Sequence, residues 1–121
     1  APYSNEIDRQ AGTLTLSLDP FVPSQMIIAP SGATHFKIVS AGVAIDFEGE
    51  AFTTDRKETV LLPWDNNATQ PLVHTHNVTA GSTHPLFLLM GIVFFQEVNG
   101  TYYPLKNGAH NPLRIVAVSG F

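Results

Sequence analysis

The sequence predicts an all-β protein, a single antiparallel β-sandwich of the immunoglobulin or fibronectin type III kind with about seven to nine strands. Short stretches of alternating apolar and polar residues recur along the chain, and Pro and Gly separate them. No segment shows the 3.6-residue period of an amphipathic helix. Because no linker or low-complexity segment interrupts the 121 residues, we expect one domain over residues 1–121.

The clearest structural signal is a β-hairpin within residues 84–105, which read HPLFLLMGIVFFQEVNGTYYPL. Asn99-Gly100 supplies the positive φ angles that a two-residue type I′ turn requires. This turn would pair Val98 with Thr101, Gln96 with Tyr103 and Glu97 with Tyr102. Gly91 lies in the middle of the apolar strand and predicts a bend or a bulge there.

The other strands are predicted from alternation and from turn residues. Residues 1–12 are interpreted as a polar lead-in, and residues 55–58, the only charge cluster, as a solvated turn. Strands are expected, in chain order, at residues 13–19, 25–29, 34–40, 42–47, 52–54, 59–62, 72–79 and, after a second turn at Asn107-Gly108, 113–118.

The composition excludes several functional classes. Charged residues make up only 13% of the chain and the formal net charge is −4, so we expect neither nucleic-acid binding nor membrane attachment. Cysteine is absent, which excludes disulfides and thiol chemistry. Three Asn-x-Thr sequons, at Asn67, Asn77 and Asn99, favour an extracellular or cell-surface location. Ordinary polar loops are the alternative interpretation, and Asn99 is better explained by its turn.

Two blocks of the chain resemble a family of uncharacterised Bacteroidetes proteins. The first is GIVFFQEVNGTYYPLKNGAHNPL, residues 91–113, which is similar to a G-I-x-F-x-Q-E-V-N-G-x-x-Y-x-L-x-N-G-x-x-N-x-L pattern. The second is SGATHFKIVSAGVAIDFE, residues 31–48. The resemblance implies a bacterial, β-rich domain at the C-terminal end of a longer protein, and it carries no activity. His110 departs from it, because the family has an aromatic residue there.

Two sets of residues are candidate metal ligands. His74 and His76 are two residues apart, so both imidazoles would lie on one face of a strand, and His84 would complete a cupin-like site. The carboxylate that usually follows such a pair is missing, and two histidines at the rim of a sheet are the alternative interpretation. Asp46, Glu48 and Glu50 would share one face and present oxygen ligands to Ca²⁺, although acidic turns between strands are common.

Aromatic residues in a polar setting suggest carbohydrate binding. Trp64 begins the loop WDNNATQP, in which Asp65 and Asn66 could hydrogen-bond a sugar stacked on the indole ring. Tyr102 and Tyr103 could add to this platform. The alternative, which we favour, is that Trp64 anchors the loop against the end of the sandwich.

We expect a structural rather than an enzymatic role. The chain lacks the Gly-x-Ser-x-Gly elbow, the P-loop and the Rossmann fingerprint, so we assign no catalytic residue and no cofactor apart from the candidate Ca²⁺. Low charge and terminal segments, residues 1–12 and 113–121, able to pair with neighbours favour a module that associates with itself or with a neighbouring domain through edge strands. Ordinary edge strands of a monomer are an equal alternative for these two segments. A carbohydrate-binding module and a cupin-like metal protein are the alternatives.

Overall fold

The computed structural model describes residues 3–105 and 113–120. Within these residues, nine strands and one short helix follow each other along the chain, and every strand pair is antiparallel. The elements are β1 (Tyr3–Asp8), β2 (Thr13–Leu18), α1 (Pro23–Met26), β3 (His35–Asp46), β4 (Ala51–Glu58), β5 (Leu62–Pro63), β6 (Leu72–Asn77), β7 (Leu86–Val98), β8 (Thr101–Pro104) and β9 (Arg114–Ser119).

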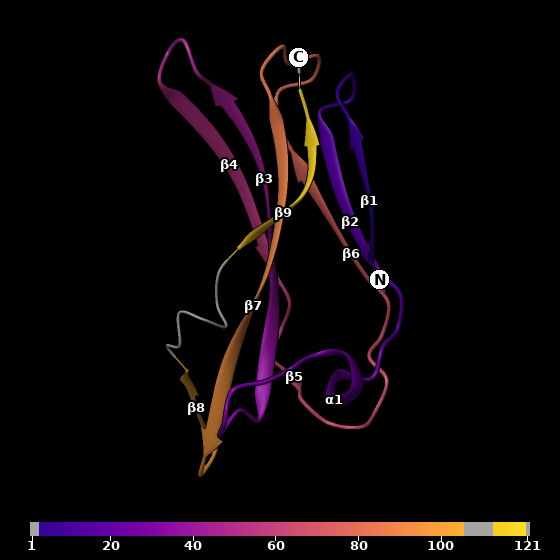
Figure 1. Cartoon of the computed structure of the whole chain (residues 1–121), viewed down its shortest axis with the longest axis vertical. Coiled ribbons are helices and arrows are strands. Elements are labelled where there is room, and N and C mark those ends of the chain that lie inside the picture. The colour runs from indigo at the N-terminus through magenta and orange to yellow at the C-terminus, as the bar shows by residue number, and fades with distance from the viewer. Residues whose placement is uncertain (1–2, 106–112, 121) are drawn as a thin grey trace.

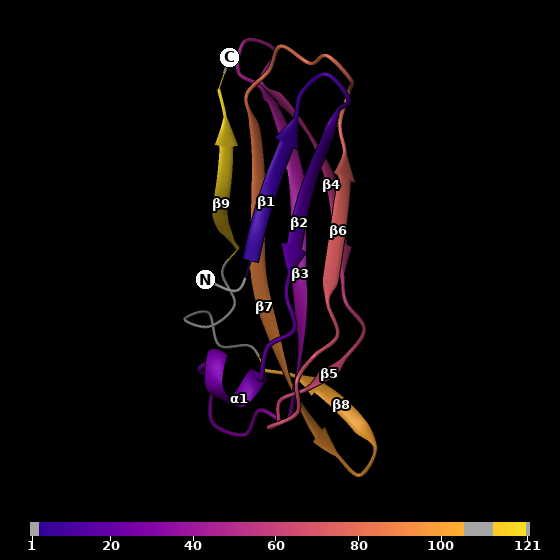
Figure 2. The same ribbon diagram turned by 90° about the vertical axis from the view of Figure 1, so that its right-hand side faces the viewer.

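The strands form two sheets that face each other, which is consistent with the predicted β-sandwich (Figure 1). The smaller sheet has the strand order β1-β2-β6. The larger sheet has the order β4-β3-β7-β8, with β5 paired to one end of β3 and β9 paired to β7. Figure 2 shows the smaller sheet in front of the larger one, and β9 beside β1 at one side of the molecule.

The core lies between the two sheets and consists mainly of Leu and Phe. Alternation along β2 buries Leu14, Leu16 and Leu18, as the sequence predicted, while the residues between them face outward. From the opposite sheet, Phe36 of β3 and Leu88 of β7 are completely buried against them. Burial of these side chains is the main stabilising term of the fold.

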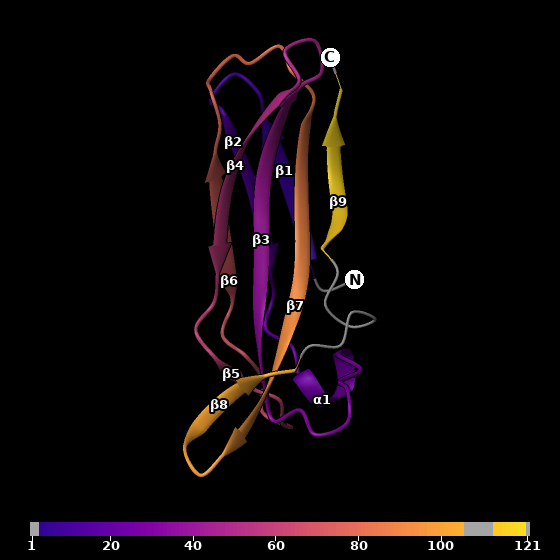
Figure 3. The ribbon, with the colours of Figure 1, turned by 90° about the vertical axis from the view of Figure 1, so that its left-hand side faces the viewer.

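The predicted hairpin is confirmed in register and in turn geometry. Gln96 pairs with Tyr103 and Val98 with Thr101, and the φ angles are 51° at Asn99 and 82° at Gly100. The hairpin of β7 and β8 extends beyond the body of the sandwich (Figure 3). The continuous register between β3 and β7 runs through Gly91, so the predicted bulge is not there. The register instead shifts between Leu88 and Leu89, where β9 pairs with β7.

Several predicted elements differ from the structure. Residues 3–8 of the predicted lead-in form β1, because Ile7 packs against the core although most of this strand is polar. Residues 34–40 and 42–47 are parts of one long strand, β3, since Gly42 continues the ladder instead of ending it. The charged residues 55–58 belong to β4, an edge strand whose side chains are mostly exposed and therefore tolerate charge.

The helix α1 replaces the strand predicted at residues 25–29. Pro23 stands in its first turn, where proline fits a helix best, and the Ile27 N–H bonds to the Pro23 carbonyl. Of the strand predicted at residues 59–62, only Leu62 is in a strand, because Thr59 bonds back to Ile38 and Pro63 ends the segment. The turn predicted at Asn107-Gly108 lies outside the described residues, as does His110.

Candidate functional site

Three buried polar side chains meet inside the sandwich beside a fourth that is part-exposed, and together they form the buried polar cluster. The alternation of β6 turns His74 and His76 inward, with 7% and 0% of their surfaces exposed. Ser40 of β3 is 0% exposed, and its Oγ lies 2.6 Å from His74 Nδ1 and 2.7 Å from His76 Nε2. The fourth member is Asp55 of β4, whose Oδ2 is 3.9 Å from His76 Nδ1.

The cluster fits because small residues of β3 leave room for the two imidazole rings. Ser40 and Gly42 are two residues apart on β3 and therefore share the face that looks toward β6. A Cβ placed on Gly42 would lie 2.7 Å from the Cβ of His76. Position 42 therefore requires glycine, because any side chain there would collide with the Cβ of His76.

The hydrogen bonds of Ser40 determine the tautomers that we assign. A serine hydroxyl has one proton, so it can donate to one histidine and must accept from the other. The Asp55 carboxylate favours a proton on His76 Nδ1, which leaves His76 Nε2 to accept the hydrogen bond from Ser40. His74 Nδ1 then carries a proton and donates to Ser40 Oγ.

Both histidines are neutral near pH 7. Burial lowers the pKa of His74, and the nearby Lys57 ammonium lowers it further. Burial also lowers the pKa of His76, and His74 and Lys57 add to this effect, while Asp55 opposes it. The His76 Nδ1 atom makes no hydrogen bond with any described residue, because Asp55 is too distant to accept one.

An Asp-His-Ser series has the same side chains as the catalytic triad of serine hydrolases, but its surroundings here do not suit nucleophilic attack. Ser40 is completely buried and its hydroxyl is engaged by two imidazoles at once. Asp55 Oδ2 also accepts a hydrogen bond from the Asn77 backbone N–H and so links β4 to β6. The cluster therefore joins the two sheets, with β6 on one side and β3 and β4 on the other.

Of the residues predicted to bind metals, His74 and His76 lie close together, but the others do not join them. His84 lines a different pocket, together with Asp46, at the end of the molecule that holds the turn between β3 and β4. The Asp46 carboxylate accepts the Gly49 N–H at 2.9 Å and so closes that turn, while Glu48 and Glu50 are exposed. Within residues 3–105 and 113–120, no three His, Asp or Glu side chains are placed to hold a metal ion.

The Trp64 loop packs against α1. The indole N–H of Trp64 donates to the Ile27 carbonyl at 3.1 Å, and the ring contacts the hydrophobic core. Asp65 accepts the Ser24 N–H through its backbone carbonyl, and Asn66 Oδ1 accepts the Ser24 hydroxyl at 2.5 Å. These contacts favour the anchoring role of Trp64 over the stacking role.

The two tyrosines lie far along the chain, on β8. Tyr102 and Tyr103 are 42% and 53% exposed. The Tyr102 ring meets the His35 ring edge to face, with ring centroids 4.9 Å apart. Neither tyrosine adjoins Trp64 among the ring contacts that the structure describes.

Sequence reasoning finds the two histidines but misses their partners. His74 and His76 share a face with Leu72 and Val78, as the alternation predicted, but both are buried between the sheets, so the interpretation of them as residues at the rim of a sheet is wrong. The signal for Ser40 is the run of small residues Ser40-Ala41-Gly42, which the sequence alone favours as a break between two strands. Asp55 is predicted in a turn, so its position beside His76 could not be foreseen.

Comparison with known proteins returned no match: no family model, no curated protein and no solved structure resembles the chain closely enough to report. Among the described residues, no helix has the length and apolar character needed to cross a membrane. The function proposed below is therefore argued from the geometry of this chain.

Proposed function

We propose that this chain is a non-enzymatic structural module of an extracellular or cell-surface assembly, and that it associates with a second copy of itself through the edge strand β9. The proposal rests on the open side of β9. β9 pairs with β7 along one side, and no described strand pairs with its other side. An unpaired strand edge is a template for pairing with another chain.

β9 has few of the charged side chains that usually keep an edge strand from pairing with other chains. Ile115 and Val118 are each 57% exposed, and Arg114 is the only charged residue of the strand. The edge strand β4 is different, because it carries four consecutive charged residues, 55–58. Charge on an edge opposes pairing with other chains, so β4 is protected and β9 is not.

β9 is also held in place, as a docking strand should be. The Arg9 guanidinium donates to the Ser119 carbonyl at 2.8 Å and to the Ser119 hydroxyl at 2.9 Å. It also donates to the carbonyls of Ser82 and His84, and so ties the end of β9 to the connection between β6 and β7. A bulge at Val116 blunts the edge in part, so we expect weak association.

The strand order supports the immunoglobulin-like type within this proposal. In constant-type immunoglobulin domains, strands A, B, E and D form one sheet and C, F and G form the other. Here β1-β2-β6 corresponds to A-B-E, and β3, β7 and β9 correspond to C, F and G. The difference is β4, which pairs with β3 in the larger sheet instead of joining the smaller one.

A charge placed on β9 tests the proposal. Val118→Lys adds a positive charge to the unpaired edge, and Val73→Lys adds the same charge at an equally open position of β6, where Val73 is 62% exposed. We expect analytical ultracentrifugation to show concentration-dependent association of the wild type, loss of association in Val118→Lys and no change in Val73→Lys. A wild type that sediments as a monomer at millimolar concentration would contradict the proposal, and so would equal effects of the two substitutions.

The carbohydrate-binding alternative loses its main residue, because the Trp64 ring packs inward. It would rest on the exposed Tyr102 and Tyr103. Both belong to β8, in the hairpin that projects from the sandwich (Figure 3). A glycan array probed with the wild type and with Tyr103→Ala distinguishes this alternative, which requires a glycan signal that the substitution removes.

A further inference from the structure

A pocket of about 280 Å³ opens next to the buried polar cluster. It lies between the two sheets, where β6 and the segment before it face β3 and the connection from β4 to β5. Apolar side chains, including Phe21, Ile38, Leu62 and Leu72, form most of its lining. Ligand sites are typically concave and apolar with a few polar groups that orient the ligand, and this pocket is at the small end of their range.

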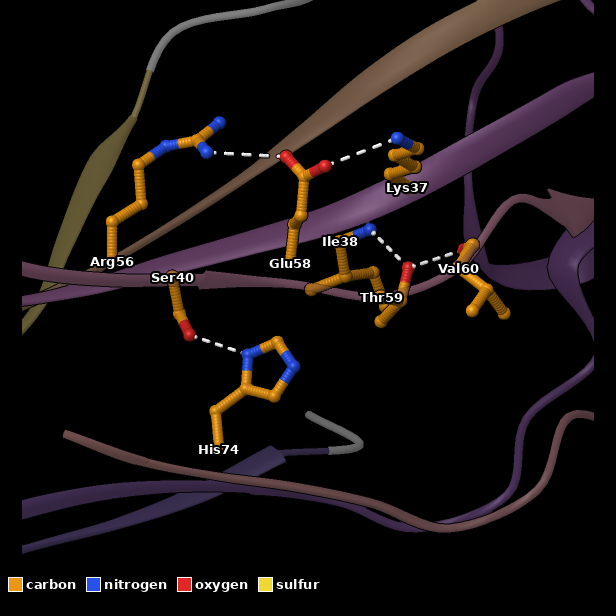
Figure 4. Close-up of polar contacts among 8 residues, drawn as sticks. All are labelled: Lys37, Ile38, Ser40, Arg56, Glu58, Thr59, Val60 and His74. Atoms are coloured by element: carbon orange, nitrogen blue, oxygen red, sulfur yellow. Dashed lines mark hydrogen bonds and ion pairs between the residues drawn. The ribbon is translucent and has the colours of Figure 1, made fainter.

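His74 is the polar group that lines this pocket from inside the protein. It is 7% exposed, and its Nδ1 is already bonded to Ser40. Its Nε2 makes no hydrogen bond to any residue that the structure describes. Figure 4 shows this second nitrogen on the side of the ring away from Ser40, toward Thr59 and Val60, which also line the pocket.

The tautomer of His74 determines what Nε2 can bind. Because Asp55 and Ser40 place the His74 proton on Nδ1, Nε2 presents a lone pair to the pocket. A lone pair accepts a hydrogen bond and cannot donate one. Asp55 on β4 therefore determines, through His76 and Ser40, that His74 can bind only ligands that donate a hydrogen bond.

The other polar groups of the pocket, apart from the exposed Gln70, are already engaged. Glu58 is paired with Lys37 at 3.0 Å and with Arg56 at 3.1 Å, as Figure 4 shows. The Thr59 hydroxyl accepts the Ile38 N–H and donates to the Val60 carbonyl. The Thr69 hydroxyl accepts the Phe21 N–H. Gln70 is exposed to solvent.

We propose that this pocket binds a small, uncharged and mainly apolar molecule, an alcohol or a phenol, whose hydroxyl donates a hydrogen bond to His74 Nε2. The apolar lining would cover the hydrocarbon part. The described lining residues offer no unengaged buried charge, which disfavours ionic ligands. This site is independent of β9, so it adds a binding activity to the structural role proposed above.

Three probes of similar size test the site. Cyclohexanol can donate a hydrogen bond, cyclohexanone can only accept one, and methylcyclohexane can do neither. We expect saturable shifts of the backbone amide resonances around the pocket on titration with cyclohexanol, and an affinity about three- to tenfold higher than for cyclohexanone, the effect of one hydrogen bond. No saturable binding, or equal affinity for alcohol and ketone, would overturn the proposal.

A substitution tests whether His74 causes the higher affinity for cyclohexanol. His74→Phe keeps an aromatic ring of similar size and removes Nε2, so the preference for cyclohexanol should disappear, while Gln70→Ala elsewhere in the lining should leave it unchanged. Retention of the preference in His74→Phe would refute the assignment. If this variant does not fold, imidazole ¹⁵N spectra of the wild type decide, because cyclohexanol must shift His74 Nε2 more than the nitrogens of His76.

Discussion

At the scale of single residues, the buried polar cluster is the least expected feature of the core. Two histidines and a serine occupy positions at which Leu, Ile or Val would normally stand, and burying polar groups is costly unless they are hydrogen-bonded. Ser40 meets this requirement for His74 Nδ1 and His76 Nε2. The cluster is therefore stable only while both imidazoles are neutral.

This condition predicts a pH dependence of stability. The pKa values of His74 and His76 are lowered in the folded state, so the unfolded chain binds protons that the folded chain does not. Their contribution is complete above the ordinary histidine pKa of about 6.5 and is lost as the pH falls through the lowered folded values, by up to ~1.4 kcal/mol per pH unit for each histidine. Asp55 and Lys57 of β4 are the charged groups that act on the pair.

Urea unfolding between pH 7.5 and pH 5 measures this effect. The free energy of unfolding of the wild type should decrease as the pH is lowered from 7.5 to 5. The decrease per pH unit should be smaller in His74→Gln, which retains an amide beside Ser40 but has no proton to gain. A free energy of unfolding that does not change over this range would refute the account of the cluster.

At the scale of elements, short connections position the strands. The turn from β1 to β2 ends at Gly12, which has a φ of +74° and accepts the Val78 N–H through its carbonyl. Gly81, in the connection from β6 to β7, has a φ of +70°. A Cβ on Gly12 would lie 2.5 Å from the Val78 carbonyl oxygen, whereas a Cβ on Gly81 would meet nothing within 4 Å.

These two glycines form a matched pair of substitutions. Gly81→Ala should cost only the strain of the left-handed conformation, about 1–2 kcal/mol. Gly12→Ala should cost that strain together with a steric clash against backbone atoms, about a further 1–3 kcal/mol. Thermal and urea unfolding of both variants would measure the difference. Equal losses of stability would show that the clash at Gly12 is relieved without cost.

At the scale of the whole molecule, the sequence predicted local structure better than the arrangement of strands. The Asn99-Gly100 turn and the buried leucines of β2 were predictable, because turn chemistry and alternation act within a few residues. β1 and β4 were not predicted in full, because polar residues can occupy edge strands, whose pairing depends on distant neighbours. For the same reason, the shared face of the two histidines could be predicted from the sequence, but their burial and their contacts with Ser40 and Asp55 could not.

We propose that copies of the chain meet along β9, and hydrogen exchange at increasing protein concentration measures this contact. Backbone amides of β9, residues 114–119, should exchange more slowly as the concentration rises from low micromolar to millimolar, while those of the edge strand β6 should keep the same rates. Protection that rises with concentration in β6 or β4 instead, or exchange in β9 that is independent of concentration, would contradict it.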